Sequence, residues 1–188
     1  CLMRSTAYLS DCGTYRYELE RDWAAPDAHD QSVVWIMLNP STADATADDP
    51  TIRRCISFAK TWGVERLKVV NLFAYRATDP KELATAEDPT GSLNFAVIED
   101  AFFNAADFGD IVVCAWGASA PIDTTEAAER IKATAEHFGV DMYCLGTTKN
   151  GSPRHPLYVK GDTELELLPA AGHIAPIEQP TNGQEATT

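Results

Sequence analysis

The chain has 188 residues and a net charge of −13, because 28 acidic side chains outnumber 15 basic ones. This length is typical of one domain with a sizeable core, and an acidic balance argues against general nucleic-acid binding. No apolar run approaches the roughly 18 residues of a membrane span, so we expect no membrane partner.

The cysteines give little support for a metal or a disulfide framework. None of the five forms a C-x-x-C pair, and Cys55, Cys114 and Cys144 lie in apolar patterns. Such cysteines are typical of reduced thiols in a core. We therefore expect no metal, no cofactor and a cytoplasmic location.

Alternating residues from Tyr8 to Trp23 predict a β-hairpin with its turn near Cys12 and Gly13. Apolar runs then predict buried strands, and amphipathic segments between them predict helices. The predicted strands cover residues 33–38, 66–74, 110–117 and 140–146, and the helices cover residues 51–63, 93–109 and 124–139.

The first predicted helix has a defined beginning and an apolar stripe. Asp49 followed by Pro50 is typical of an N-cap with proline at the first helical position. Helical spacing predicts that the buried stripe consists of Ile52, Cys55, Ile56 and Ala59.

This element order predicts an α/β fold with three layers, α/β/α, a four-stranded parallel central sheet and an added N-terminal β-hairpin. We expect one domain over residues 1–170 and a mobile polar tail at 171–188. Ligands of open α/β sheets bind beyond the carboxyl ends of the strands. The candidate segments are therefore "NPSTAD", "NLFAYRATDP", "WGASA" and "GTTKNGSPRHPLY".

The first segment, with Asn39, Pro40 and Ser41, is either a turn that ends its strand or a rigid corner that presents Asn39 to a ligand or water. Asp44 follows on the same loop as Asp48 and Asp49. Acids in such a loop are solvated, cap a helix or act as a general base, and Asp44 is our candidate base.

Asn71 interrupts an apolar strand near its end. A buried carboxamide offers a donor and an acceptor that must both be satisfied. It therefore either bonds a neighbouring loop or recognises an amide-like edge such as that of a pyrimidine.

The last two segments combine small residues with a constrained histidine. Residues 116–120 allow close backbone approach, for a ligand that reaches Ser119 or for tight helix–sheet packing. His155 lies between Pro153 and Pro156, which restrict the backbone. It is either a surface residue or a fixed imidazole that donates to a developing anion.

In their order, "LNPSTAD", "VVNLFAYRATDP", "CAWGASA" and "GSPRHPLYV" resemble the corresponding motifs of the uracil-DNA glycosylase superfamily over about residues 33–160. The resemblance implies that Asn39 positions water, Asn71 recognises the base and His155 stabilises the departing base. Phe58 or Trp62 would stack on the base. Ser41 stands where glycine is usual in this corner.

The chain is more closely similar to the uncharacterised family catalogued as domain of unknown function 1643. The stretches "YRYELER", "IMLNPSTAD", "DDPTIRRC" and "RHPLY" carry this similarity, which covers nearly the whole folded chain. That family implies no activity.

The superfamily resemblance implies a DNA glycosylase that cleaves the N-glycosidic bond of a flipped-out damaged or modified base, with a pyrimidine as the first expectation and Leu157 and Tyr158 as a wedge. We expect the protein to be a monomer. The side chains expected to grip phosphates are Arg76, Lys149, Arg154 and Lys160. Three alternatives stay open: an N-glycosidase or transferase on a free nucleoside or nucleotide, a non-catalytic nucleic-acid or nucleotide binder, and a scaffold without a ligand.

Overall fold

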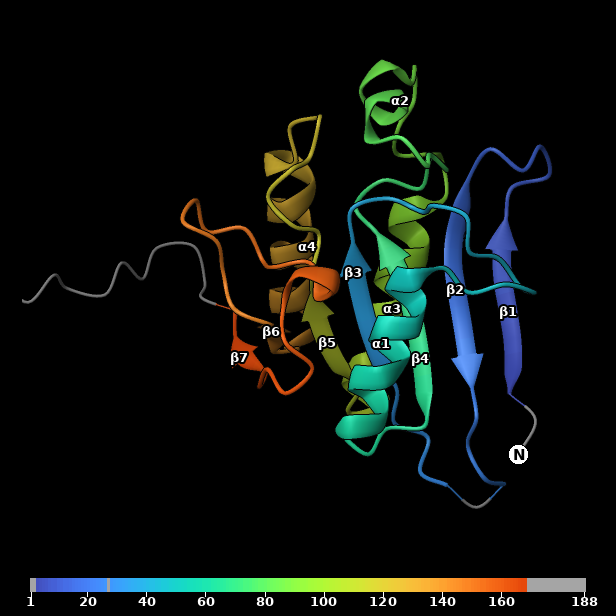
Figure 1. Cartoon of the computed structure of the whole chain (residues 1–188), viewed down its shortest axis with the longest axis vertical. Coiled ribbons are helices and arrows are strands. Elements are labelled where there is room, and N and C mark those ends of the chain that lie inside the picture. The colour runs from blue at the N-terminus through green and yellow to red at the C-terminus, as the bar shows by residue number, and fades with distance from the viewer. Residues whose placement is uncertain (1–2, 27, 169–188) are drawn as a thin grey trace, which may run out of the picture.

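The computed structural model describes residues 3–26 and 28–168 (Figure 1). These residues form an α/β fold around a seven-stranded mixed sheet with the strand order β1-β2-β4-β3-β5-β6-β7. The strands are β1 (Arg4–Leu9), β2 (Arg16–Asp22), β3 (Val33–Met37), β4 (Arg66–Asn71), β5 (Ile111–Cys114), β6 (Met142–Cys144) and β7 (Glu166–Leu167). The helices are α1 (Pro50–Thr61), α2 (Pro80–Thr85), α3 (Asn94–Phe108) and α4 (Thr125–Phe138).

The predicted parallel core is confirmed, since β4, β3, β5 and β6 pair in parallel in that order. The predicted hairpin of β1 and β2 is also present, and it extends the same sheet because β2 pairs with β4 antiparallel. At the opposite edge, β7 pairs with β6 antiparallel. The sequence pattern did not predict this short strand.

Helices cover both faces of the sheet, as the three-layer prediction requires (Figure 1). On one face, Trp35 of β3 belongs to the cluster that contains α1 residues. On the other face, Val34 and Ile36 belong to the cluster that contains residues of α3 and α4. Every residue of β3 is buried, which explains its uninterrupted apolar run.

Helix α1 begins as predicted and buries three of the four residues of the predicted stripe, Ile52, Cys55 and Ala59. The Asp49 side chain accepts a hydrogen bond from the Ile52 N–H at 2.9 Å, so Asp49 is the N-cap. Phe58 is buried, whereas Ile56 is only partly buried. Phe58 therefore belongs to the core between α1 and the sheet.

The predicted tail at 171–188 lies outside the described residues, and the single domain over 1–170 stays a prediction. Across the residues that the structure does describe, no helix is long and apolar enough to cross a membrane.

Candidate functional site

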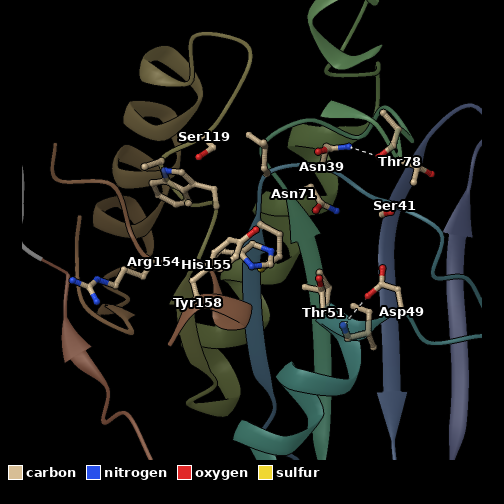
Figure 2. Close-up of a pocket in the computed structure, with 18 of the residues that line it drawn as sticks. Asn39, Ser41, Asp49, Thr51, Asn71, Thr78, Ser119, Arg154, His155 and Tyr158 are labelled. Carbon is tan, nitrogen blue, oxygen red and sulfur yellow. Dashed lines mark hydrogen bonds between the residues drawn. The ribbon is translucent and has the colours of Figure 1, made fainter. Parts of the chain in front are cut away.

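A pocket of about 590 Å³ opens at the carboxyl ends of β3, β4 and β5, where the sequence predicted it (Figure 2). All four predicted segments contribute to its lining, through residues such as Asn39, Asn71, Trp116 and His155. Arg16 at the start of β2 also lines it. A site of this volume is large enough for a small organic ligand.

Asn71 is the least satisfied polar residue of the pocket. It is 1% exposed, and neither atom of its side-chain amide has a hydrogen-bond partner among the described residues. Its main-chain carbonyl accepts a hydrogen bond from Nδ2 of the buried Asn94 at 2.9 Å. The Asn71 carboxamide is therefore left with an unused donor and acceptor beside a cavity, which is costly without a ligand.

His155 turns toward the same pocket from the opposite side (Figure 2). Its Nδ1 accepts a hydrogen bond from the Leu157 N–H at 3.3 Å, which assigns the ring proton to Nε2. Burial lowers the pKa of His155, against an opposing effect of the Asp49 carboxylate. At neutral pH the ring is therefore a neutral donor.

The neighbouring loop fits closely against His155. Gly117 has a φ of 77°, and a Cβ at this position would lie 3.4 Å from the His155 Cβ. The Gly117 N–H also donates to the Pro153 carbonyl at 2.9 Å. The small residue in "WGASA" thus permits two loops to pack at the rim of the pocket.

Arg54 of α1 anchors the turn that follows His155, a role that no sequence pattern indicated. Its guanidinium donates to the carbonyls of Pro156 at 3.3 Å and Val159 at 2.7 Å. The same group lies 4.9 Å above the Phe58 ring centre. Arg54 therefore fixes the 3₁₀ turn η1 (Pro156–Tyr158) to the helix.

The acid that lines the pocket is Asp49 and not Asp44, the candidate base expected from the sequence. Asp44 accepts hydrogen bonds from the backbone of Thr46 and Ala47 and from the Thr46 hydroxyl, and it does not line the pocket. These bonds lower the pKa of Asp44. Asp44 thus stabilises its own loop, while Asp49 lines the pocket at the beginning of α1.

Two buried arginines of β2 hold the loop on which both acids lie. Arg21 forms an ion pair with Asp48 at 2.8 Å and also donates to the Asp44 carbonyl. Arg16 donates to the Ala43 carbonyl. The alternation of Tyr17 and Leu19 with Arg21 could have indicated that Arg21 points inward, but no pattern singled out Arg16.

Phe58 does not face the pocket, contrary to its predicted place in base stacking. It is 1% exposed, and its ring stacks on Trp62 with centres 5.4 Å apart. Trp62 in turn stacks on Trp35, and neither Phe58 nor Trp62 lines the cavity. Helix α1 uses these rings to pack against the sheet.

Asn39 lines the pocket with only part of its amide available. Its Nδ2 donates to the carbonyls of Pro40 at 3.0 Å and Ala77 at 3.1 Å. Oδ1 therefore remains as the atom that can accept from a ligand or water. Pro40 itself is buried and does not line the pocket, whereas Ser41 does.

The four predicted phosphate-binding cations are not all at the pocket. Lys149 and Arg154 line it from the last loop. Arg76 instead donates to the Gly13 carbonyl at 3.2 Å, in the turn of the hairpin, and Lys160 is exposed away from the cavity lining. The expected four-residue patch is thus reduced to two.

Two of the three remaining predicted residues, Tyr158 and Ser119, line the pocket. Tyr158 is 83% exposed and lines the cavity, and its ring centre lies 5.6 Å from that of His155. Ser119 is exposed and lines the pocket as well. Leu157 is 44% exposed and does not line it.

Fold and site together define an α/β protein with a pocket at the carboxyl edge of the parallel strands of a mixed sheet. Residues 16–157 match the family described as "Protein of unknown function (DUF1643)", and the chain belongs to this family. No curated protein and no solved structure matches the chain significantly. The expected link to the uracil-DNA glycosylase superfamily therefore has no support from these comparisons.

Proposed function

We propose that this protein is an N-glycosidase that binds a nucleobase in the pocket and cleaves its bond to the sugar. One observation carries the proposal: the fully buried carboxamide of Asn71 has no partner among the described residues, and it lines the same pocket as the constrained ring of His155. The carboxamide matches a base edge that presents one acceptor and one donor.

The chemistry of such a cleavage assigns a role to each polar side chain. Breaking the bond generates positive charge on the sugar and negative charge on the base. The Asp49 carboxylate would stabilise the sugar cation or accept a proton from water, and the Asn39 Oδ1 would orient that water. The Nε2–H of His155 would donate to the base as it departs.

Our first substrate class is a damaged or modified base, most simply a pyrimidine, flipped out of DNA. A pocket of about 590 Å³ admits one base and its sugar, but no duplex. Exposed Leu157 and Tyr158 would contact the bases next to the gap, and Lys149 and Arg154 would contact phosphates.

A free nucleoside or nucleotide is the second candidate, favoured by two observations. The net charge of −13 opposes a long polyanion. Moreover, only Lys149 and Arg154 of the four expected cations line the pocket. A mononucleotide would need no more than these two.

The test is base release, followed by mass spectrometry, from a panel of modified oligonucleotides and from the corresponding free nucleotides. Release from oligonucleotides supports the first substrate class, and release only from nucleotides supports the second. Tight binding without any release would show a non-catalytic binder and refute the N-glycosidase.

Salt dependence provides an independent discriminator. If DNA is the substrate, replacing Lys149 and Arg154 with Gln should reduce the slope of log affinity against log salt by roughly 0.7–0.9 for each phosphate that the protein no longer neutralises. The same replacement of Arg76 and Lys160, which do not line the pocket, should leave the slope unchanged.

A further inference from the structure

Arg16 is a buried cation without a direct anionic partner among the described residues. It is 2% exposed and lines the pocket. Among the ion pairs of the part of the chain that the structure describes, none includes Arg16, and its Nε has no acceptor there. Arg21, equally buried on the same strand, is paired with Asp48 at 2.8 Å. Arg16 donates to the Ala43 carbonyl, so what distinguishes it from Arg21 is the lack of an anionic partner among the described residues.

The charges around Arg16 do not replace such a partner. Burial lowers the pKa of Arg16 to about 10, and repulsion from Arg76 and Arg21 acts in the same direction. Attraction from Asp49 and Asp44 opposes this effect. Arg16 stays protonated at neutral pH, and an anionic ligand would offset the cost of its buried charge.

We propose that Arg16 binds the nucleobase end of the ligand and stabilises the departing base as an anion, an inference that rests on the proposed N-glycosidase function. In this step the bond between the anomeric carbon and the base nitrogen breaks, and its electron pair stays on the base. Water adds hydroxide to the anomeric carbon and gives up one proton. The base takes up one proton, so that the net reaction adds one water.

The position of Arg16 favours a base anion over a phosphate. Arg16 and Asn71 are both buried, and both leave polar atoms without a partner among the described residues. Lys149 and Arg154, the cations of the last loop, are exposed. Arg16 and Asn71 are therefore shielded from water, whereas a phosphate beside the exposed Lys149 and Arg154 would remain hydrated.

The experiment measures binding of free uracil and 5-fluorouracil to the full chain, from neutral pH to the pH at which each base is half ionised. Both bases should bind more tightly as they lose their proton, and 5-fluorouracil, the stronger acid, should do so at lower pH. Replacing Arg16 with Met should remove about 10- to 100-fold of the affinity for the ionised base.

Arg16→Lys and Arg21→Lys form the matched control pair. Arg16→Lys keeps the charge and should retain part of the pH-dependent gain. Arg21→Lys should weaken the fold through the Asp48 loop and leave the gain unchanged. If Arg16→Met does not fold, the wild type and Arg16→Lys still test the role of Arg16. The increase in affinity with pH must follow the ionisation of each base.

Three outcomes would overturn the role of Arg16: no binding of either base, affinity that ignores base ionisation, or inorganic phosphate that competes in an Arg16-dependent manner. Failure of the N-glycosidase itself gives a different result. Arg16-dependent binding of base anions without base release from any substrate would support the anion site and refute the proposed reaction. Base release together with pH-independent binding of free bases would support the N-glycosidase and refute the anion site.

Discussion

The side-chain amide of Asn94 donates a hydrogen bond of 2.9 Å to the main-chain carbonyl of Asn71. A second bond from the same nitrogen, 3.1 Å long, reaches the carbonyl of Leu72. The end of β4 is therefore held by Asn94 from α3 and needs nothing from the Asn71 side chain. The two buried asparagines have separate tasks, one structural and one available for a ligand.

This separation predicts opposite effects for two alanine variants. Asn71→Ala should reduce discrimination between bases by about 1–3 kcal/mol, the range of one bidentate contact. Its melting temperature should stay close to that of the wild type, since an unpartnered buried amide costs about 1–3 kcal/mol and its removal offsets the reduced packing. The measurements are the rates of base release from substrates that differ only in the base, and thermal melting.

Asn94→Ala is the control, because it leaves two buried carbonyls without their donor. It should lower the free energy of unfolding by about 1–3 kcal/mol and leave base preference intact. If Asn71→Ala melts far below Asn94→Ala and base preference persists, the Asn71 amide is structural.

His155→Ala should slow single-turnover base release by about 10²–10³, the usual effect of removing one preorganised donor. Its loss from the cap of η1 should change the melting temperature little, because Arg54 still holds this turn. Substrate affinity, measured under the same conditions, should be nearly unchanged. A rate within about twofold of the wild type, far from the effect of a preorganised donor, would exclude His155 from this role.

The pH profile follows from the lowered pKa of His155. Protonation of Nδ1 removes its hydrogen bond from the Leu157 N–H, which fixes the ring. Base release should therefore continue below the ordinary histidine pKa of about 6.5 and fall once the folded ring is protonated. Because the unfolded chain binds this proton more readily, the stability from His155 is complete above about 6.5 and is lost as the pH falls through the folded pKa. Urea unfolding of the wild type and His155→Gln at several pH values checks this prediction. If the free energies of unfolding of the two proteins change with pH in parallel, the prediction is wrong.

Asp49→Asn and Asp44→Asn test which acid serves the reaction. Asparagine is as good an N-cap as aspartate, so helix α1 should persist in Asp49→Asn, while loss of the charge should slow base release by about 10²–10⁴. Asp44→Asn should keep the wild-type rate, since Asp44 does not line the pocket. Circular dichroism checks that helix α1 persists, and single-turnover rates check the reaction. A slower rate for Asp44→Asn than for Asp49→Asn would contradict the assignment of Asp49.

Arg54→Met should loosen the turn after His155 without unfolding the sheet. Its two carbonyl contacts, to Pro156 and Val159, are charge-assisted and worth about 1.5–3 kcal/mol each. Amide hydrogen exchange of Leu157 and Tyr158 should accelerate, whereas that of β3 should not. Arg53→Met, one residue earlier on α1, is the matched control; equal acceleration in both variants would remove the anchoring role.

The parts of the fold set by local sequence were predictable. The apolar run of β3 and the Asp49-Pro50 beginning of α1 both appear as expected. Ile56 and Phe58 flank the helical stripe on opposite sides, however, and periodicity alone does not decide between them. The choice depends on Trp35 of the sheet, which packs on Phe58 with ring centres 6.1 Å apart.

The candidate site was predictable from the ends of the parallel strands, and less so from the antiparallel edge. Asn71 is the last residue of β4 and His155 lies on the loop after β6, so the topology brings both to the same edge of the sheet. Arg16 reaches the pocket because β2 pairs with β4, a long-range contact that no local pattern specifies. Asp44 bonds within its own loop, whereas Asp49 lines the pocket. Composition does not reveal this difference.

The first and last residues that line the pocket are Arg16 and Tyr158, so segments far apart in the chain meet there. A compound that fills the pocket would contact these distant segments at the same time. It would therefore have to dissociate before the protein could unfold globally. At a concentration about a hundred times its Kd, such a compound adds about 2.7 kcal/mol to the stability. Thermal-shift screening of nucleobases, nucleosides and nucleotides can therefore find the natural ligand before any reaction is known, with Asn71→Ala and Arg16→Lys to confirm where it binds.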